Sequence, residues 1–122
     1  MQQIKVRAET EDDFRAIDVV NLSAFQCESE AQLVSELRKS DVFIPDLSLV
    51  AELNGRIVGH VMLSRAVLKS DKGTQEILVL GPESVVPSQS HRGIGSELIE
   101  AAVARARPLC YKAIVVAGHP DY

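Results

Sequence analysis

Residues 85–99 of the chain read VVPSQSHRGIGSELI: an apolar segment that Pro87 interrupts, a polar turn with two glycines, and the start of an amphipathic segment. This order predicts a strand, a tight turn and a helix that begins close to Gly93. Glycines let backbone N–H groups approach a ligand closely, and the first N–H groups of a helix have no partner within the helix. Such a turn suits a phosphate group. A turn that serves only close packing is the alternative interpretation of the same two glycines.

The composition is that of an ordinary globular chain. With 122 residues, of which 46% are hydrophobic and 25% charged, we expect one domain over residues 1–122 with a single core. No apolar run has the length of a membrane span and the first residues, MQQIK, are no signal peptide, so we expect a cytoplasmic protein with no membrane contact. The net charge of −4, without a cluster of Lys and Arg, argues against nucleic acid as a partner.

The two cysteines lack the spacing of a zinc or redox motif. We therefore expect no metal site, and we interpret Cys27 and Cys110 as small buried hydrophobic residues.

Apolar periodicity and turn residues predict the element order β-α-α-β-β-β-α-β, a mixed α/β fold. Thr10 and Asp13 form a capping-box pattern for the first helix, and Asn54-Gly55 is a strong hairpin signal. Three antiparallel strands form a meander, and a βαβ crossover brings the last strand beside the third of them. The expected strands cover residues 4–7, 47–53, 56–67, 75–86 and 111–117, and the expected helices cover 10–25, 29 to before Pro45, and 93–107. The expected buried faces are Phe14, Ile17 and Leu22 on the first helix, Ala31, Leu33, Val34 and Leu37 on the second, and Ile94, Leu98, Ile99, Ala102 and Val103 on the third.

The strand over residues 75–86 contains Gly81-Pro82, which predicts a break in its hydrogen-bond ladder. Glu83 follows this break and is an acid in an otherwise apolar stretch. It is therefore our candidate for a general base, with a carboxylate on a solvated strand face as the alternative. We interpret His60, within the second strand of the hairpin, as structural.

Two common phosphate-binding motifs do not fit. A Rossmann unit places a third glycine after G-x-G and opens its domain with the motif, whereas here the turn follows a meander. A P-loop has Lys and Ser or Thr after its last glycine, where this chain has Ser96-Glu97.

In its element order and its glycine turn, the chain resembles the GCN5-related N-acetyltransferase (GNAT) superfamily. Its motif, Gln/Arg-x-x-Gly-x-Gly/Ala, falls on residues 90–95, with Ser90 at the first position. Leu80-Gly81-Pro82 and Gly118-His119-Pro120 are similar to a subgroup of small bacterial acetyltransferases. The superfamily continues past Gly-His-Pro into a tyrosine-bearing helix and two further strands, which the sequence to Tyr122 does not include.

The resemblance implies an acetyl-CoA-dependent N-acetyltransferase that moves an acetyl group to a primary amine of a small molecule or a protein, without a metal. It implies a tyrosine as the catalytic acid, with Tyr122 standing beside or in place of the superfamily tyrosine. The reaction also needs a base, for which Glu83 is our candidate. The cofactor-binding residues that it implies are Ser84, Val85, Val86, Ser90, His91, Arg92, Gly93, Ile94, Gly95 and Ser96.

Two other functions stay open at this point. The chain could be a catalytically impaired remnant that binds CoA, or an interaction module that pairs its last strand with a partner. The apolar run at residues 113–117 is typical of an exposed edge strand, so we expect a homo-oligomer formed through it.

Overall fold

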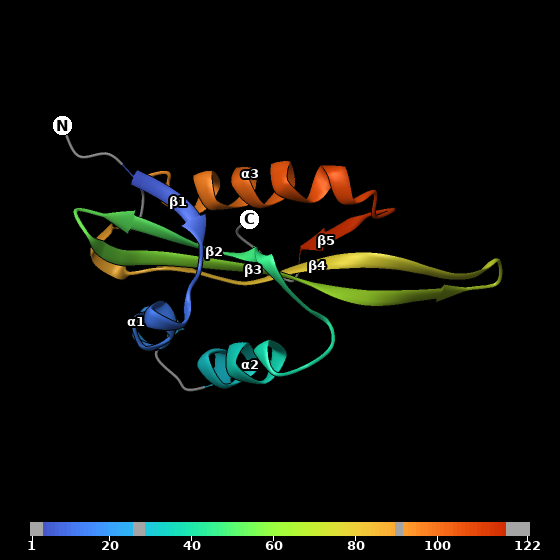
Figure 1. Cartoon of the computed structure of the whole chain (residues 1–122), viewed down its shortest axis with the longest axis horizontal. Coiled ribbons are helices and arrows are strands. Elements are labelled where there is room, and N and C mark those ends of the chain that lie inside the picture. Colours follow the sequence, from blue (N-terminus) through green and yellow to red (C-terminus); the bar gives the residue numbers. More distant parts are fainter. Residues whose placement is uncertain (1–3, 26–28, 90–91, 117–122) are drawn as a thin grey trace.

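The computed structural model of the chain describes residues 4–25, 29–89 and 92–116, and every structural statement below refers to these residues. One five-stranded sheet lies between α3 on one face and α1 and α2 on the other (Figure 1). The strands are β1 (Ile4–Ala8), β2 (Phe43–Leu53), β3 (Arg56–Ser70), β4 (Gly73–Val85) and β5 (Ile114–Val116). The helices are α1 (Phe14–Phe25), α2 (Ser29–Arg38) and α3 (Ile94–Ala106), with short 3-10 turns η1 (Glu11–Asp13), η2 (Pro87–Gln89) and η3 (Arg107–Leu109).

The sheet order is β1-β2-β3-β4-β5, antiparallel throughout except that β4 and β5 are parallel. This confirms the predicted element order, the meander and the crossover through α3. Local signals in the sequence account for the turns. Asn54 and Gly55 have φ values of 53° and 80°, as a tight hairpin between β2 and β3 requires. The Thr10 backbone N–H donates to Asp13 Oδ2 over 2.8 Å, which confirms the capping box.

The ladder between β3 and β4 breaks where Gly81-Pro82 predicts it. Leu80 pairs with Leu63 and Glu83 pairs with Val61, so Gly81 and Pro82 together lie opposite Met62. Two residues facing one is the pattern of a β-bulge, which bends a strand and changes the direction of the residues after it. The segment of β4 from Glu83 onward therefore leaves the register of the first part of the strand.

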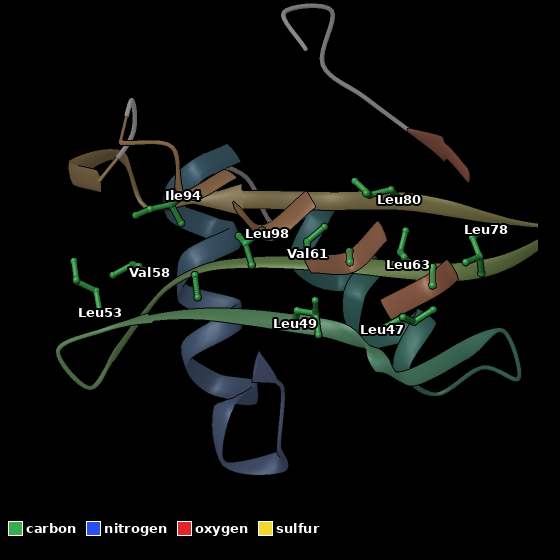
Figure 2. Close-up of a cluster of buried hydrophobic side chains, with 13 residues drawn as sticks. Leu47, Leu49, Leu53, Val58, Val61, Leu63, Leu78, Leu80, Ile94 and Leu98 are labelled. Carbon is green, nitrogen blue, oxygen red and sulfur yellow. The ribbon is translucent and has the colours of Figure 1, made fainter. Parts of the chain in front are cut away.

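Each face of the sheet has its own core. Between the sheet and α3 lies the larger cluster, in which Leu49, Val61, Leu63 and Leu80 meet Leu98 (Figure 2). Under α1 and α2 the cluster is smaller and consists of Ile17, Val34, Val50 and Met62. The face under α1 and α2 is also where most of the buried polar side chains of the strands lie.

Several expectations were wrong in detail. Leu22 and Leu33 are 39% and 45% exposed, because α1 turns Ile17, Val20 and Asn21 toward the sheet and α2 turns Val34. Cys110 is exposed, since it follows the turn η3 in a left-handed conformation at the surface; Cys27 lies outside the described residues.

The strands also differ in length from the expected ones. β2 begins at Phe43 and passes through Pro45, with its pairing to β3 irregular between Phe43 and Ser48. β5 begins at Ile114 and not at residue 111, and its described residues pair with Leu78, Val79 and Leu80. Residue 117 of the expected strand lies outside the described residues. Val115 and Val116 of β5 are each 49% exposed. Self-association through this strand stays a prediction.

Candidate functional site

The described residues leave the outer backbone edge of β4 open at its C-terminal end. The Val86 N–H donates to the Val58 carbonyl over 2.9 Å, which fixes the alternation of hydrogen-bonded pairs between β3 and β4. By that alternation Ser84 directs its backbone groups toward His60, whereas Glu83 and Val85 direct theirs away from β3. Among the described residues, β5 pairs with β4 at Leu78, Val79 and Leu80. Within the described part of the chain, no strand occupies the outer side of Glu83 and Val85.

The N-terminus of α3 supplies a second set of backbone donors. Gly93 precedes the helix with φ 79° and ψ 7°, a left-handed conformation that glycine adopts at little cost. The Glu97 N–H donates to the Gly93 carbonyl over 3.0 Å, so the N–H groups of residues 94–96 come before the first bond of the helix. A Cβ added at Gly93 would meet no atom of the described residues within 4 Å, so they leave the turn open on that side. The geometry suits an anion at the end of a helix dipole.

Gly59 on β3 brings these two features together. A Cβ at Gly59 would lie 2.9 Å from Leu98 Cδ1 and 3.2 Å from the Ser84 carbonyl oxygen. The first turns of α3 thus pack directly on the sheet at the position where a side chain is missing. Gly59 pairs with Val85, so the N-terminal half of α3 covers the sheet beside the open edge of β4.

Most of the predicted site residues lie at the end of β4 or at the N-terminus of α3. Glu83 is half-buried, and its pairing with Val61 places it on the α3 side of the sheet. Val85 and Val86 are half-buried against the α3 core, and Ile94 is buried in it, so that only the backbone of Ile94 remains for a ligand. Arg92, Gly93 and Ser96 are exposed and Gly95 is half-buried. Ser90, His91 and Tyr122 lie outside the described residues.

Ser84 has a different environment from its neighbours. Its side chain is 4% exposed and lies under α1, where Ser84 Oγ donates to Asn21 Oδ1 over 3.0 Å. The sequence pattern did not indicate Asn21 as a buried residue, because a polar residue on a predicted helix is ordinarily placed toward solvent. Its signal would have been its position four residues after Ile17, on the same helix face.

A second network of buried polar side chains joins Glu9, which follows β1, to residues of β2, β3 and α2. Arg38 Nε donates to Glu9 Oε2 over 2.8 Å, and the Ser48 hydroxyl donates to Glu9 Oε1. His60 Nε2 lies 3.0 Å from Ser48 Oγ and 3.2 Å from Glu9 Oε1. A carboxylate only accepts hydrogen bonds, so this network assigns the proton of a neutral His60 to Nε2. His60 is therefore structural, as predicted.

Burial and hydrogen bonding set the charges of this network. Burial alone raises the pKa of Glu9, but hydrogen bonds from His60, Arg38 and Ser48 outweigh it and lower that pKa to about 2. Burial lowers the pKa of the fully buried His60, and the hydrogen bond to Glu9 only partly offsets this effect. Glu9 is ionised and His60 neutral in the folded protein at neutral pH.

We expect the free energy of unfolding to fall as the pH drops below the ordinary histidine pKa of 6.5, because His60 takes up a proton in the unfolded chain and not in the folded one. Glu9 adds a second loss between pH 4.5 and about pH 2, where the unfolded chain binds its proton first. Urea unfolding of the wild type and of His60→Gln at about pH 7.5 and about pH 5 measures the first effect. The variant should lose part of the pH dependence, and an undiminished dependence would show that His60 is not neutral in the fold.

The sequence pattern of the Acetyltransferase (GNAT) family matches residues 11–121. The chain belongs to this family. A GNAT family acetyltransferase from Brucella melitensis, solved in complex with acetyl-CoA, has 30% identity and a TM-score of 0.85 over 98% of this chain and 79% of that one. The GNAT family N-acetyltransferase YhbS from Escherichia coli, solved with CoA, has a TM-score of 0.84 at 22% identity, over 99% of this chain and 66% of that one, and supports the fold.

Among curated proteins, this GNAT chain is 32% identical over 110 residues to the uncharacterised N-acetyltransferase YjhQ of Escherichia coli K12. The match covers 90% of the chain and 61% of YjhQ, so the chain spans about three fifths of that relative. None of the described helices is long and apolar enough to cross a membrane. Nor do the described residues gather three or more His, Cys, Asp or Glu side chains that could hold a metal ion.

Proposed function

We propose that the protein transfers an acetyl group from acetyl-CoA to a primary amine of a small molecule or a protein. The observation that carries this proposal is the open edge of β4 at Glu83 and Val85 beside the N-terminus of α3. The edge of β4 offers hydrogen bonds to an extended arm that contains amides. The N-terminus of α3 offers hydrogen bonds to phosphate. Acetyl-CoA has both chemistries in one molecule, and the Brucella melitensis relative was solved with acetyl-CoA.

In this proposal, β4 binds the pantetheine arm of acetyl-CoA and the N-terminus of α3 binds its pyrophosphate. The backbone groups of Glu83 and Val85 pair with the amides of the pantetheine arm as an added strand would, with Ser84 and Val86 completing that segment. The turn before α3 holds the pyrophosphate through backbone N–H groups, with Arg92 as the nearby cation. The pyrophosphate site that we propose consists of Ser90, His91, Arg92 and Gly93 before α3 and of Ile94, Gly95 and Ser96 in its first turn.

The reaction needs a neutral amine close to the thioester. Glu83 accepts the proton of the attacking amine as the C–N bond forms and the C–S bond breaks. Tyr122 donates a proton to the leaving thiolate of CoA. The products are an acetylated amine and free CoA, and no metal takes part.

Two measurements test the proposal. Acetyl-CoA at 100 times its Kd should stabilise the fold by about 2.7 kcal/mol, which thermal unfolding would show as a raised Tm. A panel of primary amines should then release free CoA thiol in an acceptor-dependent way. CoA binding without turnover on any amine would favour the remnant over the enzyme. An unchanged Tm with both acetyl-CoA and CoA would remove the β4 edge and the α3 turn as a cofactor site.

A further inference from the structure

Asn21 is a buried polar residue in the interior of α1. Its side chain is fully buried, with Nδ2 donating to the Ile17 carbonyl over 3.2 Å and Oδ1 accepting from Ser84 Oγ over 3.0 Å. Asparagine is a weak helix former, and burying an amide without partners costs free energy. An apolar residue at this position would pack against the sheet without either cost. The bond to Ser84 is therefore what Asn21 adds to the fold.

Ser84 occupies a special place on β4. It stands between Glu83 and Val85, the two residues whose backbone groups face the open edge, and two residues after the bulge at Gly81-Pro82. The bulge interrupts the ladder to β3, and β5 does not extend along this segment in the described part of the chain. On the α1 side, the Asn21–Ser84 hydrogen bond fixes the segment from a different layer of the fold. The helix α1, which covers one face of the sheet, thus sets the position of a segment of β4 whose free backbone groups point away from β3.

We propose that Asn21 and Ser84 are positioning residues: their hydrogen bond holds the 83–85 segment of β4 at the place where it pairs with the pantetheine arm. Neither side chain touches the ligand. The inference rests on the proposed function, since it concerns the same edge. It predicts that the pair acts on the arm and thioester of CoA and not on its nucleotide end, which the turn before α3 holds.

The test compares two ligands by isothermal titration calorimetry: CoA and adenosine 3′,5′-bisphosphate, a nucleotide fragment that lacks the arm. In Ser84→Ala the affinity for CoA should fall by about tenfold, the equivalent of one lost hydrogen bond at the upper end of its usual range. The affinity for the nucleotide fragment should stay within about twofold of the wild type. In turnover, KM for acetyl-CoA should rise with KM for the amine unchanged.

A double variant and a matched control complete the design. Ser84→Ala leaves Asn21 Oδ1 buried without its donor, whereas Asn21→Ala with Ser84→Ala removes both partners, so the double variant keeps the test usable if the single one is unstable. If the two residues act through their bond, the double variant should lose no more CoA affinity than either single variant. Ser64→Ala is the control, because Ser64 is a buried serine of β3 opposite Val79, in the part of the sheet where β5 covers β4. It should leave both affinities unchanged.

The outcomes separate this inference from the proposed function. A wild-type protein that binds neither ligand overturns both. A wild type that binds CoA together with a Ser84→Ala variant of equal CoA affinity overturns the positioning role alone. Equal losses for CoA and for the nucleotide fragment also overturn it, because they would show a general disturbance of the fold.

Discussion

Replacing Gly93 by valine should abolish the rise in Tm that acetyl-CoA produces. Gly93 has φ 79° at the start of α3, and a Cβ there would meet no atom within 4 Å among the residues that the structure describes. The valine side chain would therefore extend into the open side of the turn, where we place the pyrophosphate. It would block the close approach of the backbone N–H groups that the phosphate needs. Thermal unfolding with and without acetyl-CoA measures the effect.

The chain offers a matched control in Gly55. This glycine has φ 80° in the hairpin between β2 and β3, and a Cβ there would also meet no atom within 4 Å. Gly55→Val thus imposes a similar backbone strain, on the order of 1–2 kcal/mol, away from the site. It should lower the Tm but keep the acetyl-CoA response. If Gly93→Val responds to acetyl-CoA as the wild type does, the turn before α3 is not part of the cofactor site.

The features of the fold that the sequence predicted are those whose cause is local. Asn54-Gly55 fixes a hairpin by its own backbone preferences, and Thr10 with Asp13 caps a helix within four residues. Gly81-Pro82 predicted the bulge because proline cannot donate to a ladder. Once these turns were placed, apolar periodicity was enough for the element order and the crossover.

The sequence-based predictions were wrong or incomplete where contacts between residues far apart in the chain determine which side chains are buried. The face of α1 that is buried contains Asn21 and not Leu22, because Asn21 finds its partner at Ser84, 63 residues away in the chain. No local pattern shows such a pair. The network around Glu9 likewise joins residues of β2, β3 and α2 that no spacing in the sequence relates.

In the candidate site, too, features with a local cause could be predicted from the sequence and features that depend on distant contacts could not. Its glycine turn and the acid after the bulge could be found in the sequence, since both depend on neighbouring residues. The open edge could not be found, because it follows from which backbone groups of β4 point toward β3 and from where the described part of β5 pairs with β4. The packing of α3 on Gly59 could not be predicted from the sequence either, since a glycine inside a strand can mark a bulge, a bend or a close approach of another element.

Replacing Glu83 by glutamine should lower kcat by about 10²-fold or more, the usual contribution of a general base. Glutamine keeps the size of the side chain but cannot accept the proton of the amine. Steady-state turnover with one accepted amine at saturating acetyl-CoA measures the effect.

Glu76→Gln is the control, because Glu76 lies on the same strand but is exposed and pairs with Val67 in the outer part of the hairpin. It should leave kcat unchanged. Calorimetry should show the same CoA affinity in Glu83→Gln as in the wild type, whereas the Asn21 and Ser84 variants should weaken CoA binding. The two kinds of variant therefore separate the chemical step from the positioning of the strand. A kcat of Glu83→Gln within about threefold of the wild type would place the base on another residue or on solvent, because a loss that small is below what a general base contributes.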